Sequence, residues 1–225
     1  MYNWLSVITF PQTLDDADRT ATAAKLQALL QELPRVRSTM AMPSPADPFR
    51  LNGGDLVCRT VFESRGDYQK AVDSQQGQQV KALLNDQSTA AALNEVGYEG
   101  GLSGGAVTSP TIYRVALFCA NIEPTRDRLE QFRTETSLMP SYIKTIQRWQ
   151  LSTLSSQDTA RGLHHWTHVW EQEYAELDGL TGTYLFHPDH WAHVDRWFDP
   201  EYPEFLVDPV LVNTFCPITT SVILT

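Results

Sequence analysis

The same order of strands and helices is predicted twice along the chain, and this repetition limits the folds that are open to it. A strand over residues 3–10 is followed by a helix over residues 15–33 with apolar side chains at helical spacing. Two strands, a second helix and a weak closing strand complete the first copy by residue 96. The pattern restarts at residue 111 with a strand in which Phe118 takes the place of Phe10. Each copy follows the β-α-β-β-α-β order of a ferredoxin-like unit.

A glycine-rich segment separates the two copies. Residues 97–110 contain five glycines and no hydrophobic periodicity, which is typical of a linker. We therefore predict a first ferredoxin-like repeat over residues 1–96, a linker over 97–110 and a second repeat over 111–225. The sheet of such a repeat has helices on one face only, so its other face must be covered.

Composition excludes several classes of partner. The net charge of −10 argues against a nucleic-acid partner, which would require a basic face. No basic and then apolar leader pattern opens the sequence, and no apolar run approaches the roughly 18–20 residues of a membrane span. The three cysteines are far apart and form no CxxC pair, as in reduced proteins. We expect a cytoplasmic protein that binds neither nucleic acid nor membrane.

The histidines are concentrated in one stretch. All six lie within residues 163–200, together with four of the six tryptophans. Imidazole titrates near neutral pH and is the commonest metal ligand, so this clustering indicates a chemical role. A run of buried, hydrogen-bonded aromatic side chains is the structural alternative. The histidines are His164, His165, His168, His187, His190 and His193.

The stretch divides into a predicted strand and a predicted helix. Alternation over residues 163–175 places His168 on one face of a strand and Glu171 and Glu173 on the other, where we expect helices or solvent. Pro188 suits the first position of a helix that ends at residue 198. His190 then lies in the first turn, where the helix dipole disfavours a positive charge. A neutral imidazole is what a general base needs.

The segment from Tyr184 to His190, YLFHPDH, resembles the Tyr-x-x-His-Pro-x-His signature of the stress-responsive dimeric α+β barrel (Dabb) family. The Thr167-His168-Val169 sequence is similar to the start of that family's third strand, whose histidine lines the pocket. In plant olivetolic acid cyclase, a member of the family, the equivalents of Tyr184 and His190 are the catalytic pair. The motif is fairly specific, because the tyrosine, both histidines and the proline all match at the same spacing.

The resemblance implies an α+β fold in which two sheets pack face to face into a barrel. Family members form this barrel as dimers, whereas two fused repeats could close an intramolecular barrel. A homodimer of the fused barrel would be a further level of assembly. In the first repeat, Leu56 takes the place of His168 and Gly77 that of His190. The first repeat is therefore expected to complete the barrel without a site of its own.

Three classes of function remain open. The first is a cofactor-independent lyase or cyclase in which His190 is the base, Tyr184 orients or protonates a carbonyl oxygen and His168 assists. Its substrate would be an aromatic or polyketide-like small molecule in an apolar pocket. The second class is a divalent-metal or haem site using His187, His190 and His193, and the third is a non-catalytic stress-responsive barrel. The expected substrate-binding side chains are Trp166, Trp170, Phe186, His187, Trp191, Trp197 and Arg196.

Overall fold

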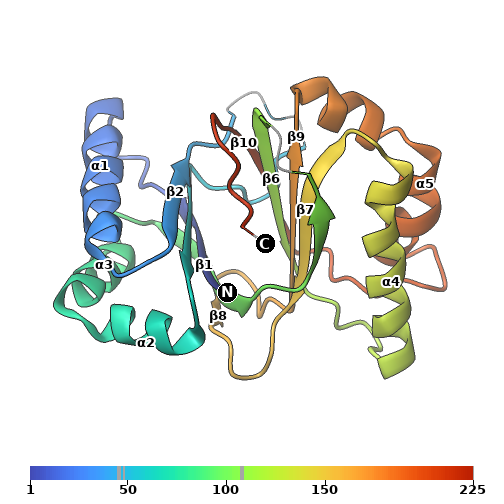
Figure 1. Cartoon of the computed structure of the whole chain (residues 1–225), viewed down its shortest axis with the longest axis horizontal. Helices are drawn as coiled ribbons and strands as arrows, with labels where there is room; N and C mark the ends of the chain where they lie inside the picture. The colour runs from blue at the N-terminus through green and yellow to red at the C-terminus, as the bar shows by residue number, and fades with distance from the viewer. Residues whose placement is uncertain (45–46, 48, 107–108, 225) are drawn as a thin grey trace.

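Two five-stranded antiparallel sheets face each other, and helices cover the outer face of each sheet in the computed structural model (Figure 1). The structure describes residues 1–44, 47, 49–106 and 109–224. Residues 107 and 108 of the predicted linker, and residue 225 at the end of the predicted second repeat, lie outside this range. Helix, sheet, sheet and helix thus form four successive layers.

The first half of the chain builds sheet A and its helical layer. Its four strands lie in the order β2-β3-β1-β4, which is the strand order of a ferredoxin-like unit. The second helix predicted for the first repeat is in fact two helices, α2 and α3, separated at Ser74. The elements are β1 (Tyr2–Thr9), α1 (Asp16–Glu32), β2 (Arg37–Ala41), β3 (Leu56–Phe62), α2 (Arg65–Asp73), α3 (Gln75–Asn85) and β4 (Ala92–Glu99).

The second half repeats this arrangement as sheet B, with strand order β10-β6-β9-β7. The predicted helix after Pro188 is present as a continuous helical run through Phe198, although its middle part is a π-helix. The elements are β6 (Ile112–Phe118), α4 (Arg126–Tyr142), β7 (Ile146–Thr153), β9 (His168–Tyr174), the π-helix η1 (Gly179–Tyr184), α5 (Pro188–His190), the π-helix η2 (Trp191–Asp195), α6 (Arg196–Phe198) and β10 (Val212–Pro217). The α+β fold of two fused ferredoxin-like repeats is therefore confirmed.

Each half also lends one edge strand to the sheet of the other. Strand β5 (Leu102–Gly105) follows β4 in the chain but pairs with β7 of sheet B. Strand β8 (Ala160–Arg161) lies between β7 and β9 in the chain but pairs with β4 of sheet A. The predicted linker over residues 97–110 is thus partly wrong, because residues 97–99 extend β4 and residues 102–105 form β5. The glycines in this segment led to the prediction of a linker, although the main chain of β5 pairs at the edge of sheet B.

The ladder registers correct one part of the repeat alignment. Phe118 pairs with His168, and Ile8 pairs with Leu56. Since Leu56 takes the place of His168, Phe118 corresponds to Ile8 and not to Phe10. The predicted match of Phe118 with Phe10 is therefore wrong by two residues.

The inner faces of the sheets form a common core. Alternate residues of β6 point inward, so that Tyr113, Val115 and Leu117 pack against Leu5 and Val7 of β1. These side chains are almost fully buried. Burial of this apolar surface, at roughly 25 cal/mol per Å², is the main attraction between the two halves.

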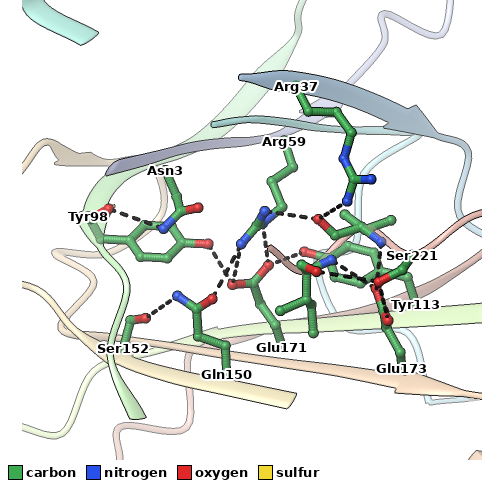
Figure 2. Close-up of polar contacts among 12 residues, drawn as sticks. Asn3, Arg37, Arg59, Tyr98, Tyr113, Gln150, Ser152, Glu171, Glu173 and Ser221 are labelled. Carbon is green, nitrogen blue, oxygen red and sulfur yellow. Dashed lines mark hydrogen bonds and ion pairs between the residues drawn. The ribbon is translucent and has the colours of Figure 1, made fainter. Parts of the chain in front are cut away.

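A buried ion pair crosses this core. Arg59 of β3 donates from Nε to Oε1 of Glu171 on β9 at 2.7 Å, and both side chains are at most 1% exposed (Figure 2). The hydroxyls of Tyr98 and Tyr113 donate to the same carboxylate at 2.8 and 2.7 Å. Burial lowers the pKa of Arg59, but the adjacent Glu171 carboxylate outweighs this effect and raises it. The prediction that Glu171 faces helices or solvent is therefore wrong.

Glu173 also points between the sheets, so the same prediction is wrong for this residue. Its carboxylate accepts hydrogen bonds from the Ser221 hydroxyl and from the main-chain N–H groups of Val222 and Ile223 (Figure 2). Val222 and Ile223 are themselves part of the inter-sheet core. Glu173 thus fixes the segment after β10 in the space between the two sheets.

No helix in the described part of the chain is long and apolar enough to cross a membrane. Cys58, Cys119 and Cys216 are all buried and unpaired, as the sequence predicts. Burial raises the pKa of the Cys216 thiol to about 12.

The ion pair leads to a prediction about stability. Replacing Glu171→Gln leaves the Arg59 guanidinium buried without a counter-charge, which should lower the free energy of unfolding by about 3–5 kcal/mol. The double variant Arg59→Met with Glu171→Leu should lose less than Glu171→Gln, because it buries neither charge. Urea unfolding followed by circular dichroism measures both. Lys70→Ala, which removes an exposed ion pair with Asp67, is the control and should leave the midpoint nearly unchanged. Equal losses from Glu171→Gln and Lys70→Ala would contradict the prediction.

Candidate active site

A cavity of about 430 Å³ lies between the outer face of sheet B and the helices of the second half. Its size falls within the usual range of small-molecule sites. Most of its wall is apolar or aromatic, and a few polar side chains interrupt it. We call it the sheet B cavity, and it is lined by Phe49, Leu51, Arg114, Ala116, Phe118, Phe132, Thr136, Trp170, Tyr184, Leu185, His190, Val194, Asp195, Phe198, Leu211 and Asn213.

Strand alternation selects the side chains that form the floor of the cavity. On β6, Arg114, Ala116 and Phe118 point outward because the intervening residues fill the inter-sheet core. On β9 the same rule turns Trp170 toward the helices and Glu171 toward sheet A. The cavity floor and the buried ion pair therefore occupy opposite faces of one sheet.

Tyr184 and His190 meet in this cavity. Their rings are in edge contact, with centroids 4.6 Å apart and planes at 76°. Tyr184 is 1% exposed at the end of η1, and His190 is 9% exposed at the end of α5. A short turn joins η1 to α5, which begins at Pro188, and the two side chains meet across it. The structure thus brings together the two residues that the family signature singles out.

Asp195 is a third member of this group. Its Oδ1 lies 3.2 Å from Nδ1 of His190, within ion-pair range but not aligned for a hydrogen bond. The contact depends on η2, because a π-helix closes i to i+5 hydrogen bonds and brings residues five apart to the same side. With Asp195 beside Nδ1, Nε2 is the ring nitrogen left for proton transfer. This arrangement of base and orienting carboxylate is common among activated catalytic groups.

His187 and His193 do not join His190 at the cavity. His187 caps α5, where its Nδ1 accepts a hydrogen bond from the Asp189 N–H at 3.2 Å. His193 stacks on Tyr142 and lies 3.8 Å from Asp189. Across the described ranges there is no group of three or more His, Cys, Asp or Glu side chains placed to hold a metal ion. The metal alternative with His187, His190 and His193 therefore has no ligand set among these residues.

His168 lies behind the cavity wall. Its ring stacks on Phe118 at 5.3 Å and meets the edge of Phe132 at 5.5 Å, and both of these phenylalanines line the cavity. His168 itself borders a different surface hollow, near Arg133. Burial, with a smaller contribution from the charge of Arg133, lowers the pKa of His168 to about 4. In this position the imidazole can support the wall but does not face Tyr184 or His190 across the cavity.

The predicted substrate-binding tryptophans have different environments. Trp170 lines the cavity. Trp166 is buried in the inter-sheet core. Trp197 is buried among the helices and donates its indole N–H to Glu135 at 2.9 Å. Trp191 is 55% exposed and donates to a main-chain carbonyl. Only Trp170 of the four is therefore placed to contact a ligand in the sheet B cavity.

The two remaining predicted substrate-binding residues also lie away from the cavity. Phe186 is 65% exposed on the turn after η1. Arg196 forms ion pairs with Glu135 and Glu204 and lies over the Trp197 ring. Burial raises the pKa of the Glu135 carboxyl, but hydrogen bonds from Arg196 and its other neighbours outweigh this effect and hold the pKa low. Arg196 thus belongs to a structural cluster.

Sequence reasoning missed Arg114, the arginine that lines the cavity. It is the single charged side chain in the apolar stretch of residues 111–120. A lone charge in a predicted strand could have indicated a functional residue. Asn213 was also missed, because a single neutral amide in the last predicted strand does not indicate a binding site. Phe49 and Leu51 come from a loop of the first half, which pairs with β10 through Leu51 and Asn213. No local pattern indicates that this loop crosses to the second half.

The equivalent face of sheet A is filled. Its cavity measures about 10 Å³. Trp4 pairs with Thr60 as Arg114 pairs with Gln172, so that an indole occupies the position of the guanidinium. Gly77, at the position of His190, packs so closely that an added Cβ would lie 2.1 Å from the Ala71 carbonyl oxygen. These contacts agree with the prediction that the first half carries no polar pocket at this position.

The family description "Stress responsive A/B Barrel Domain" matches residues 112–207. This range lies within the second half of the chain and covers 96 of its 225 residues. The matched range includes Tyr184, His190 and His168, which confirms the resemblance drawn from the signature. A search of curated proteins found no match to the sequence.

Solved structures that resemble this chain extend over both halves. An anthrone oxidase-like protein is 8% identical, with a TM-score of 0.70 and coverage of 96% of this chain and 90% of that chain. A provisionally named monooxygenase from Lactobacillus acidophilus NCFM is 8% identical, with a TM-score of 0.56 and coverage of 99% and 98%. A chlorite dismutase variant from Candidatus Nitrospira defluvii is 11% identical, with a TM-score of 0.54 and coverage of 97% and 91%. At such low identity these likenesses show the fold alone.

The environment of His168 predicts how stability depends on pH. Because the folded-state pKa of about 4 lies below the ordinary value of 6.5, unfolding binds a proton between these values. Stability should be highest above pH 6.5 and fall by up to roughly 3 kcal/mol as the pH approaches 4. His168→Phe keeps the stacked ring and removes the titration, so its stability should fall less over this range. Urea unfolding at pH 7.5 and 4.5 measures the difference, with exposed His165→Gln as control. An unchanged pH dependence in His168→Phe would contradict the prediction.

Proposed function

We propose that the protein is a cofactor-independent acid–base enzyme of the lyase or cyclase type. Its substrate would be an aromatic or polyketide-like carbonyl compound bound in the sheet B cavity. His190 is the general base, Tyr184 the hydrogen-bond donor to the carbonyl oxygen, and Asp195 the carboxylate that orients His190. The edge contact between His190 and Tyr184 inside an apolar cavity is the observation that carries the proposal.

The chemistry follows from the positions of the two polar groups. Nε2 of His190 accepts the proton from the carbon beside the carbonyl, and the electron pair moves toward the carbonyl oxygen. The Tyr184 hydroxyl stabilises the resulting enolate by hydrogen bonding. Aromatic walls exclude water, so this interaction is stronger than it would be in solution. The enolate can then attack a second carbonyl within the same substrate, and the alkoxide formed there takes up the proton that His190 holds.

A second candidate is a cofactor-free oxygenation. The names of two structural neighbours, an anthrone oxidase-like protein and a provisionally named monooxygenase, favour it. The first step is the same, because a base in an apolar pocket generates the carbanion that would react with dioxygen. Oxygen uptake distinguishes this outcome from cyclisation or cleavage, which consume none.

The sharpest test measures the proton-transfer step alone. Metal-free protein is incubated in D₂O with a panel of aromatic and polyketide-like ketones, and NMR follows deuterium incorporation beside the carbonyl. We expect exchange in the wild type, a loss on the order of 10²–10⁴ in His190→Ala and a smaller loss in Tyr184→Phe, which keeps the ring. The thermal midpoint of His190→Ala should stay close to that of the wild type. Exposed His165→Ala is the matched control and should exchange at the wild-type rate.

Further measurements on the same protein variants separate the remaining alternatives. Elemental analysis and an absorbance spectrum of the purified protein test for bound metal or haem, and metal loss in His190→Ala would assign that residue as a ligand. A folded, metal-free His190→Ala protein that exchanges at the wild-type rate would rule out the proposed base. Exchange by no member of the panel would favour the non-catalytic barrel. A cytoplasmic location and a homodimer of the fused barrel stay predictions.

A further inference from the structure

Arg114 places a positive charge on the floor of the sheet B cavity. It lies on β6, between β9 and β10, and its side chain is partly buried. The apolar part of the cavity wall, which includes Phe118, Phe132 and Trp170, extends away from it. The cavity therefore combines one cationic group with a large aromatic surface.

The partners of Arg114 are neutral. Nη1 donates to the side-chain oxygen of Gln172 at 2.6 Å, and Nε donates to that of Asn213 at 2.9 Å. The Tyr184 hydroxyl is 3.5 Å from Nη1, and the guanidinium lies over the Tyr184 ring. These contacts orient the guanidinium plane, but they add no negative charge.

The second terminal nitrogen of Arg114, Nη2, has no hydrogen-bond partner among the described residues. No carboxylate within the described ranges lies within the 4 Å of an ion pair with the guanidinium. Asp47 borders a smaller hollow that Arg114 also lines. Burial raises the pKa of this carboxyl, and main-chain hydrogen bonds and the charge of Arg114 only partly oppose that effect. Arg114 is thus oriented by two amides, and among the described residues its outer nitrogen has no hydrogen bond and its guanidinium no ion pair.

A partly desolvated cation without an ion-paired carboxylate is unfavourable, and a bound anion would compensate it. A carboxylate suits the planar guanidinium best, because two N–H groups can meet its two oxygens. Asp195, at the His190 side of the cavity, would repel that same carboxylate. The two charges would therefore fix the direction in which an acid enters, with its acidic group at Arg114.

We infer that the sheet B cavity binds an apolar or aromatic keto acid, with its carboxylate on Arg114 and its aromatic body against Phe118, Phe132 and Trp170. The keto group would then lie near the Tyr184 hydroxyl, which is next to Arg114. The placement of the keto group rests on the proposed function, whereas the binding of the carboxylate does not.

Calorimetric titration with 2-naphthoate and with its neutral analogue 2-naphthamide tests the inference without any reaction. Wild-type protein should bind the acid roughly 10- to 100-fold more tightly than the amide, as expected for hydrogen bonds to a charged group. Arg114→Met should lose most of this preference and keep its affinity for the amide, because the aromatic walls are unchanged. Lys25→Gln removes one positive charge from the exposed face of α1 and should keep the wild-type preference.

Further variants make each outcome informative. Arg114→Lys keeps the charge but loses the planar pair of donors, so its preference should fall between those of the wild type and Arg114→Met. His190→Ala should still prefer the acid, which separates this inference from the proposed catalytic role. If Arg114→Met does not fold, the wild-type comparison and Arg114→Lys decide. Equal wild-type affinity for acid and amide, no binding of 2-naphthoate up to roughly millimolar concentration, or an undiminished preference in Arg114→Lys and Arg114→Met would overturn the inference.

Discussion

The contact between Arg59 and Glu171 determines how the two halves of this barrel fit together. Each residue is a charged group buried between the two sheets, and each would be costly to bury alone. Their pairing at 2.7 Å, with two tyrosine hydroxyls on the same carboxylate, accepts only one position of sheet A against sheet B. Because Glu171 alternates with Trp170 along β9, the same contact sets the floor of the cavity on the opposite face. Apolar packing brings the sheets together, and the ion pair specifies their alignment.

Fusion of the two repeats allows them to differ. In the first half Trp4 fills the space below the helices, and Gly77 lets α3 approach the end of α2. In the second half, at the position of Trp4, Arg114 leaves an open cavity, and a loop of the first half contributes Phe49 to its wall. A symmetric homodimer would have to build two identical sites. One chain with two unequal repeats can use one half for stability and the other for binding.

Most of the fold could be predicted from the sequence, because strands with period two and helices with apolar stripes report directly on local structure. The sequence could not predict which face of a strand points toward the other sheet. Alternation separates His168 from Glu171, but only the position of the partner sheet shows that Glu171 points inward. The π-helix that carries Asp195 to His190 has no sequence signature comparable to Pro188, and the exposure of Phe186 depends on the turn that precedes the helix. Tyr184 and His190 were found because a family signature encodes their spacing, whereas Arg114 needed the assembled sheet.

The strand order of sheet B explains how Arg114 remains in an apolar environment. β6 lies between β10 and β9, so a side chain on its outer face has a neighbour on each side. Gln172 stands directly opposite Arg114 on β9, and Asn213 lies diagonally on β10, where it pairs with Ala116. An edge strand could supply an acceptor from one side only. The central position thus gives Arg114 two hydrogen bonds, from Nε and Nη1, that limit its rotamers at the floor of the cavity. The orientation that a rigid site requires is a consequence of the ferredoxin-like topology, in which the first strand of each repeat is central.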